Sequence, residues 1–323
     1  MIFAHVSQTP LAGAAWAAAE AFREAGHDSF CIAPEDYGNG RRMATHYRYP
    51  PVGGAAARLT AADAIFCHQG WPYQQRWYPR GKPTIGWYHS SPTADQIDRK
   101  LESDGWPWGV TGGYEARLHP GCTALPELYP LKHRFYRVRE KPAGRVRIAY
   151  SPPDAYPATG AGNHRETVLA SLAGLDADVD VIVGLSLEED LRRKAVAHVV
   201  IDDCITGAYN RASLDGLALG CVVVNNCDRL CAWNVQRMSG GCGHPFTLSG
   251  PGRLRQTLRE LIACGPQTLA HLGRRNRRWF EAAWSPAALI ARNFQPLIDA
   301  ALDNARGRAA GGQHAPQERI GSP

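Results

Sequence analysis

The chain has 323 residues, and its 44% hydrophobic and 20% charged residues support a packed core and exclude a disordered chain. The formal charge of +6 permits an anionic ligand without requiring nucleic acid. No apolar run reaches the roughly 18 residues that cross a bilayer, and the start MIFAHVSQTP lacks the pattern of a signal peptide, so we expect a cytoplasmic protein without a membrane span.

The first half of the chain alternates between short apolar runs and a helical pattern. A strand at 2–6 is followed by a turn containing Gly13 and by an alanine-rich helix at 14–24, which Gly26 ends. Short apolar runs predict further strands at 29–33, 64–67 and 84–88. This alternation is typical of βαβ units with a parallel sheet.

A basic segment at 131–147 contains Pro142-Ala143-Gly144, where we place a boundary between two domains. A second alternating series follows it. We expect strands at 147–150, 179–184, 199–201 and 222–225, and helices at 165–175, 188–195, 213–219 and 254–264. One or two helices, interrupted near Pro286, are expected over 269–304.

The predicted fold class is α/β, with two Rossmann-like parallel-sheet domains facing a cleft. The expected divisions are an N-terminal domain at 1–143, a C-terminal domain at 144–280, a helix at 281–305 that crosses back to the first domain, and a disordered tail at 306–323. Open parallel sheets bind ligands at the carboxyl ends of their strands, so the cleft between the sheets is the expected site.

One segment of the second half resembles a known binding motif. Residues 209–220 read YNRASLDGLALG and precede the valine-rich run CVVVN, which is similar to the donor-binding motif of the retaining family-four glycosyltransferases with the GT-B fold. PLAG at 10–13 resembles the glycine-rich loop of that family, and GWYHS at 86–90 resembles its strand that ends in a histidine at the cleft. The order of motifs also resembles that of glycosyltransferases encoded by many tailed phages, which implies a host cytoplasm for a phage protein.

The resemblance implies a nucleotide-sugar donor, most often a UDP- or GDP-sugar, held by the second domain. The helix start at Ser213 and Leu214 would supply amide groups to the diphosphate, since helix N-termini attract anions. Asp215 would accept the ribose hydroxyls. Gly13 and Tyr209 belong to the implied donor-binding loops.

Two basic residues, His164 and Arg165, stand where the family has its basic pair for the diphosphate. The resemblance implies retention of configuration, with the leaving diphosphate taking the proton of the acceptor and with no metal or other cofactor. Arg165 would then stabilise the departing diphosphate, and His89 would lie near the transferred sugar, so both are predicted to be catalytic. Gly207 replaces a glutamate that contacts the sugar in the family, which leaves the sugar unidentified.

The acceptor stays open between a protein, a glycan and a hydroxymethylated DNA base. Aromatic residues of the first half could stack on sugars or bases, and the run 274–278, RRNRR, could contact an anion such as DNA or form a solvated helix face. The aromatic residues are Trp71, Tyr73, Trp77, Trp87, Trp106 and Trp108.

Several alternatives accompany this prediction. Because the family's glutamate is missing, the chain could be a degenerate, non-catalytic module that binds a nucleotide sugar or serves in assembly. Ser213 and Asp215 could form a plain helix cap. The nine cysteines predict reduced thiols, although the spacing of Cys227, Cys231, Cys242 and His244 also permits a structural zinc site. An oxidoreductase is set aside because G-x-G-x-x-G is missing after the first strand.

Overall fold

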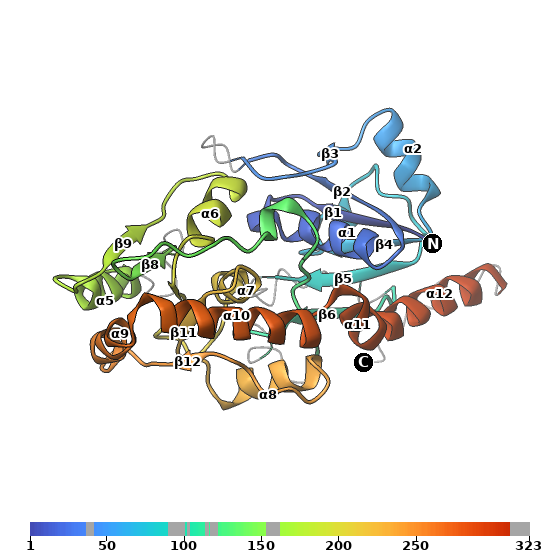
Figure 1. Cartoon of the computed structure of the whole chain (residues 1–323). Helices are drawn as coiled ribbons and strands as arrows, with labels where there is room; N and C mark the ends of the chain where they lie inside the picture. Colours follow the sequence, from blue (N-terminus) through green and yellow to red (C-terminus); the bar gives the residue numbers. More distant parts are fainter. Residues whose placement is uncertain are drawn as a thin grey trace, which may run out of the picture.

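The computed structural model describes residues 1–36, 42–89, 101, 104–113, 116, 122–152 and 162–310, except for the side chains of residues 71, 162–164 and 310. Within these ranges the chain forms two parallel sheets with helices packed around them (Figure 1). These are the two parallel-sheet α/β domains that the sequence predicts.

The first sheet has seven strands in the order β3-β2-β1-β4-β5-β6-β7. The strands are β1 Ile2–Ser7, β2 Asp28–Ala33, β3 Tyr47–Arg48, β4 Ala64–His68, β5 Thr84–Tyr88, β6 Trp108–Thr111 and β7 Thr123–Leu125. All neighbouring strands are parallel, and the order reverses between β1 and β4. Strands β4 and β5 are buried along their whole length, which explains their continuous apolar sequence.

The second sheet has five parallel strands in the order β12-β11-β10-β8-β9. They are β8 Arg147–Tyr150, β9 Asp178–Val181, β10 Val199–Ile201, β11 Val222–Asn225 and β12 Thr247–Leu248. The order reverses between β8 and β10. Ligands of open α/β sheets bind at such a reversal, outside the carboxyl ends of the strands.

Helices flank both sheets. Beside the first sheet lie α1 Ala14–Glu24, preceded by the short turn η1 Leu11–Gly13, and α2 Gly54–Ala61. The second half contributes α5 Gly162–Leu172, α6 Leu187–Lys194, α7 Arg211–Ala218, α8 Arg229–Met238, α9 Leu254–Ala263 and α10 Gly265–Ala283. Helix α7 packs against β10 and β11, and it follows β10, one of the two strands at the reversal of the second sheet.

The C-terminal part of the chain returns to the first sheet. Figure 1 shows α10 leading from α9 toward α11 Pro286–Leu289, after which a π-helical turn at Ile290–Phe294 continues into α12 Gln295–Ala310. Helix α11 packs on α1, and α12 packs on β4 and β5. Residues 306–310, which we expected in a disordered tail, belong to α12, whereas 311–323 lie outside the described ranges.

One continuous hydrophobic core includes residues from both sheets. The two halves approach closely at Gly13, where a Cβ atom would lie 2.7 Å from Cδ2 of Leu187 on α6. Gly13 also has φ +79°, a conformation that residues with side chains disfavour. Both the backbone conformation and the lack of space for a Cβ atom therefore require glycine in this turn. No helix in the described part of the chain is long and apolar enough to cross a membrane.

The predicted elements agree with the structure where the apolar runs are short and well bounded. Strands at 84–88, 147–150, 199–201 and 222–225 and the helix at 14–24 are confirmed to the residue. The helix predicted at 165–175 instead spans 162–172, and the strand predicted at 179–184 ends at Val181. The helix predicted at 213–219 begins two residues earlier, at Arg211.

Candidate functional site

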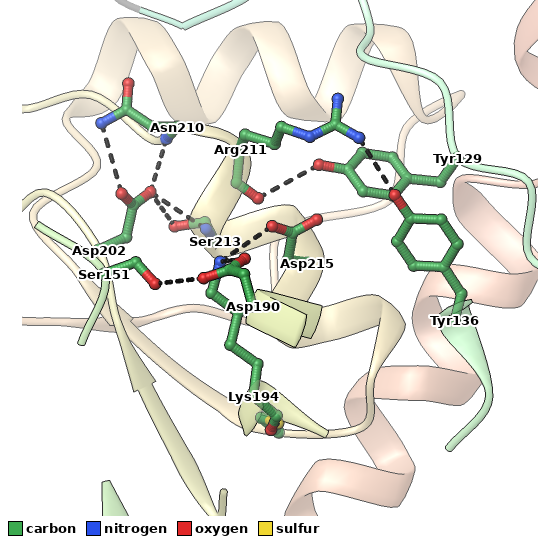
Figure 2. A network of polar contacts seen from close by, with 11 residues as sticks. Tyr129, Tyr136, Ser151, Asp190, Lys194, Asp202, Asn210, Arg211, Ser213 and Asp215 are labelled. Atoms are coloured by element: carbon green, nitrogen blue, oxygen red, sulfur yellow. Dashed lines mark hydrogen bonds and ion pairs between the residues drawn. The ribbon is translucent and has the colours of Figure 1, made fainter. Parts of the chain in front are cut away.

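The start of α7 is held by Asp202, which follows the end of β10 (Figure 2). Its Oδ2 accepts hydrogen bonds from the backbone amides of Asn210 (2.6 Å) and Ser213 (3.2 Å) and from Oγ of Ser213 (2.6 Å). Asn225, at the end of β11, donates to the same Oγ (2.8 Å). A carboxylate of the protein therefore occupies the position at which a helix N-terminus attracts an anion.

This arrangement corrects the prediction of a plain cap at Ser213. The cap residue is Asn210, and Ser213 is the third residue of the helix. Ser213 and Leu214 are buried, at 0% and 1% exposure, so neither side chain faces solvent. Burial raises the pKa of Asp202, and the hydrogen bonds from Ser213 and Asn210 offset only part of that rise.

A second group of buried charges lies beneath α7. Nζ of Lys194, on α6, lies 3.1 Å from Oδ2 of Asp215 and 2.7 Å from Oδ2 of Asp190. The other oxygen of Asp190 accepts from the hydroxyl of Ser151, which follows β8 (2.8 Å). Burial alone would lower the pKa of Lys194, but the two carboxylates outweigh it and raise that pKa, so the ammonium stays charged.

Asp215 is thus engaged within the protein. The residue is 2% exposed. Its Oδ2 faces Lys194, while Oδ1 has no hydrogen-bond partner in the described part of the chain. Binding to ribose hydroxyls, which the resemblance implies, would require Asp215 to become accessible. That role stays a prediction.

Arg211, the first residue of α7, connects the two halves of the molecule. Its guanidinium lies over the ring of Tyr129 (5.0 Å) and donates to the hydroxyl of Tyr136 (3.1 Å), and its carbonyl accepts from Oη of Tyr129 (3.2 Å; Figure 2). Nη1 of Arg211 also lies 3.5 Å from Oε2 of Glu127. Glu127 comes just after β7, so this ion pair ties the helix of the predicted donor motif to the first sheet.

His89 follows β5 and ends a line of buried histidines. Its Nδ1 lies 2.6 Å from Oε1 of Glu127, and its Nε2 lies 2.7 Å from Nδ1 of His68. Nε2 of His68 lies 3.1 Å from Nδ1 of His5 on β1. Both ring nitrogens of His89 therefore have protein partners, and a sugar hydroxyl could bind its ring only by replacing one of them.

When the three imidazoles are neutral, their partners allow only one direction of hydrogen-bond donation along the row of histidines. Glu127 accepts the proton of His89 Nδ1, so Nε2 of His89 accepts from His68, and Nε2 of His68 accepts from His5. Burial, followed by the charge of neighbouring histidines, lowers the pKa of His5 and His68 well below the usual value. Burial raises the pKa of Glu127, but His89 and Arg211 outweigh it and leave that pKa lower than usual, so the carboxylate stays ionised.

Arg165 lies in the first turn of α5 and is exposed. Its charge acts on the hydroxyl of Tyr150, the last residue of β8, and Asp202 and Asp203 act on the same hydroxyl. Arg165 belongs to the helix that follows β8, and its role at the diphosphate stays a prediction. His164 lies in the same helix, and its side chain is outside the described part of the structure.

The remaining predicted residues have structural positions of their own. Tyr209 is 5% exposed, and its hydroxyl packs so close to Gly112 that a Cβ there would lie 2.9 Å away. Gly207, where the family has a glutamate, has φ +82°. A glutamate would be strained in that backbone conformation, which gives a local reason for the departure.

The zinc alternative is not supported in the described part of the chain. No group of three or more His, Cys, Asp or Glu side chains there is placed to hold a metal ion. None of the nine cysteines forms a disulfide, and Cys227 and Cys231 are buried, whereas Cys242 is exposed. Buried thiols of this kind behave as small apolar side chains.

Sequence reasoning missed Glu127, Lys194, Asp202 and His68 as members of the site. Only Asp202 carried a usable signal, because acidic residues directly after a predicted strand lie at the ligand-binding edge. The other three depend on contacts between segments far apart in the chain.

The two doubly wound parallel-sheet domains define the class of the protein: it has the GT-B fold, an architecture found in glycosyltransferases. Solved structures of Alr3699/HepE from Anabaena, one with UDP and glucose and one with UDP-glucose, have a TM-score of 0.52 to this chain at 11% identity, covering 93% of it and 100% of HepE. AviGT4, a glycosyltransferase involved in avilamycin A biosynthesis, has a TM-score of 0.47 at 14% identity, covering 97% of this chain and 99% of its own. The sequence matches no family model and none of the curated proteins.

Proposed function

We propose that the protein is a glycosyltransferase that moves a sugar from a nucleotide-sugar donor, such as a UDP- or GDP-sugar, to an acceptor hydroxyl. The observation that carries the proposal is the polar set at the reversal of the second sheet, where Ser151, after β8, bonds Asp190 and Asp202, after β10, bonds the start of α7. This is the position at which open α/β sheets bind ligands. HepE, which shares the fold, was solved with UDP-glucose.

The proposed reaction needs little covalent participation by the protein. A bond forms between the acceptor oxygen and the anomeric carbon, the bond from that carbon to the diphosphate breaks, and the acceptor proton passes to the diphosphate. Transfer by this route retains configuration and requires no metal or other cofactor. Arg165 would stabilise the charge that develops on the diphosphate, because it is exposed beside the carboxyl edge of the second sheet.

The proposed role of His89 near the transferred sugar depends on its buried partners. It belongs to the first sheet, and Glu127 connects it to Arg211 on α7. Contact with the transferred sugar would require His89 to exchange His68 or Glu127 for a sugar hydroxyl. The acceptor would lie on the side of the first sheet and is a protein, a glycan or a hydroxymethylated DNA base.

The burial of the aromatic residues reduces the number of candidates for stacking on an acceptor. Tyr73, Trp87 and Trp106 are buried, at 2%, 0% and 2% exposure, and therefore belong to the core. Trp77 and Trp108 are half-buried and keep part of their rings available. In the described part of the chain, these two are the members of the predicted aromatic set that could still stack on an acceptor.

A second candidate function is a non-catalytic module that binds a nucleotide sugar. Two observations favour it: Asp202 already occupies the start of α7, and Asp215 is paired with Lys194. Gly207 also stands in place of the family's glutamate. The polar side chains of this motif therefore stabilise the fold by binding other groups of the protein. We place either form of the protein in the cytoplasm, where scattered reduced thiols are the rule.

A thermal-shift experiment tests donor binding directly. UDP, GDP, ADP and CMP and their common sugar conjugates are compared, each with and without Mg²⁺. We expect one base to raise the melting temperature without metal, since a ligand at 100 times its Kd adds about 2.7 kcal/mol of stability. Arg165→Ala should abolish the shift, whereas Arg259→Ala, an exposed arginine of α9, should keep it.

The outcomes separate the candidates. A failure of every nucleotide to shift the transition would overturn both. Binding of a sugar nucleotide without its hydrolysis or transfer to any acceptor would support the non-catalytic module, and release of the free nucleotide from the conjugate would support the transferase.

A further inference from the structure

A concave surface lies between α6 and the segment that connects the two sheets. Arginines dominate its lining, and the concavity encloses about 590 Å³ of empty space including its open mouth. The lining residues are Arg134, Phe135, Arg137, Arg139, Glu188, Arg192 and Ala195. We call this surface the arginine pocket.

The arginine pocket carries excess positive charge. Arg134 pairs with Glu188 (3.3 Å), and Arg192 pairs with Glu189 outside the lining (2.5 Å). Arg137 and Arg139 are exposed and have no ion pair with any described residue. Exposed guanidinium groups gathered in one concavity raise the local positive potential, which attracts an anion.

The chemistry of the lining favours phosphate groups. A guanidinium presents a planar set of donors that matches two oxygens of one phosphate. Phe135 adds a half-buried aromatic ring, with Arg134 placed 5.3 Å from its centre. Guanidinium groups beside an aromatic ring are the combination that holds single-stranded nucleic acid, through its backbone and by base stacking. A membrane surface is planar and suits protruding basic groups better than a concavity.

We propose that the arginine pocket binds the phosphate backbone of a single-stranded nucleic acid. The site is separate from the proposed donor site, because α6 uses two opposite faces. Asp190 and Lys194 are buried toward Ser151 and Asp215, whereas Glu188 and Arg192, two positions away around the helix, line the pocket.

Fluorescence anisotropy with a labelled oligothymidylate of about 20 nucleotides tests the proposal on the full chain. If the four arginines each contact a phosphate, the logarithm of affinity should fall with the logarithm of salt concentration with a slope of about −3, from about −0.7 per contact. The double variant Arg137→Ala/Arg139→Ala should reduce the slope by about 1.4 and weaken binding about tenfold or more at low salt.

The matched control is Arg229→Ala/Arg259→Ala, which removes two exposed arginines from α8, at the bottom of the molecule in Figure 1, and from α9, at its lower left, both away from α6. Selective loss of binding in the pocket variant, with an unchanged melting temperature, supports the proposal. Equal loss in both variants, undetectable binding by the unaltered protein, or pocket-dependent binding of anionic vesicles in place of the oligonucleotide would overturn it. None of these readouts uses a sugar nucleotide, so failure of the proposed transfer leaves the result intact.

Discussion

The line from His5 through His68 and His89 to Glu127 places three imidazoles at buried positions of the first sheet. Each imidazole is both donor and acceptor, so the chain satisfies its own members and leaves only Nε2 of His5 without a partner among the described residues. A proton added at Nε2 of His5 would create a buried charge whose N–H has no acceptor among the described residues. Protonation of these histidines therefore makes the free energy of unfolding depend on pH.

We predict that acid destabilises the protein through His5 and His68. Their pKa values are lower in the folded chain than in the unfolded chain, so the unfolded chain binds more protons below about pH 6.5. Stability is then complete above that pH and falls as the pH decreases toward the folded pKa. Each histidine contributes a slope of up to about 1.4 kcal/mol per pH unit, measurable by urea unfolding between pH 5 and 7.5.

The variant His5→Leu should reduce the slope of the free energy of unfolding against pH by the contribution of about one proton. The control His271→Leu, at an exposed histidine of α10, should leave that slope unchanged. Equal slopes in the two variants would show that the buried chain does not titrate.

At the scale of the element, α7 depends on a carboxylate from a neighbouring strand. Asp202 satisfies the amides of Asn210 and Ser213 and the hydroxyl of Ser213 at once. Helix α8 has a simpler arrangement, in which its own cap residue Asp228 accepts from the amide of Cys231 (2.9 Å). The two helices therefore offer a comparison between a tertiary cap and a local one.

We predict that Asp202→Ala destabilises the fold by about 3 kcal/mol, because it removes charge-assisted hydrogen bonds and leaves buried donors unpaired. Asp228→Ala should cost about 1 kcal/mol, as expected for the loss of a helix cap. Urea unfolding at neutral pH measures both. An equal cost for the two substitutions would show that the tertiary contacts of Asp202 add nothing beyond capping.

At the scale of the whole molecule, the C-terminal helices pack into the hydrophobic core around the first sheet. Phe294 is fully buried, and its ring centre lies 4.7 Å from that of Trp87, 6.0 Å from that of Phe66 and 6.1 Å from that of Phe22. Trp284 is also buried, and its indole nitrogen donates to the carbonyl of Glu127 (2.9 Å). The last helices are thus part of the first domain's packing.

Substitution of Phe294 tests this packing. We predict that Phe294→Ala costs about 3–5 kcal/mol, as deletion of a buried aromatic ring does, and that Phe294→Leu costs clearly less. Arg306→Ala, which removes an exposed ion pair with Asp303 on the same helix, should cost less than about 1 kcal/mol. A small effect of Phe294→Ala in urea unfolding would mean that the C-terminal helices fold independently of the first sheet.

Three of the elements missed in the sequence have weak local signals. Helix α2 reads GAAARLTA and buries only Ala55 and Leu59, so its hydrophobic period is weak. Strands β6 and β7 have four and three residues, too short for a periodic signal. Strand β6 is positioned by pairing with β5, and β7 by pairing with β6, which is a property of the assembled sheet.

The sequence by itself determined the α/β class, the two parallel sheets and the placement of the motif 209–220 after a strand, because periodicity and turn residues act over a few neighbours. Only the tertiary structure decided that Asp202 occupies the start of α7, that Asp215 faces Lys194, and that Glu127 joins His89 to Arg211. These partners are separated by 11, 21, 38 and 84 positions. Hydrogen bonds and ion pairs depend on distances within a few ångströms, and only the packed sheets bring such distant residues that close.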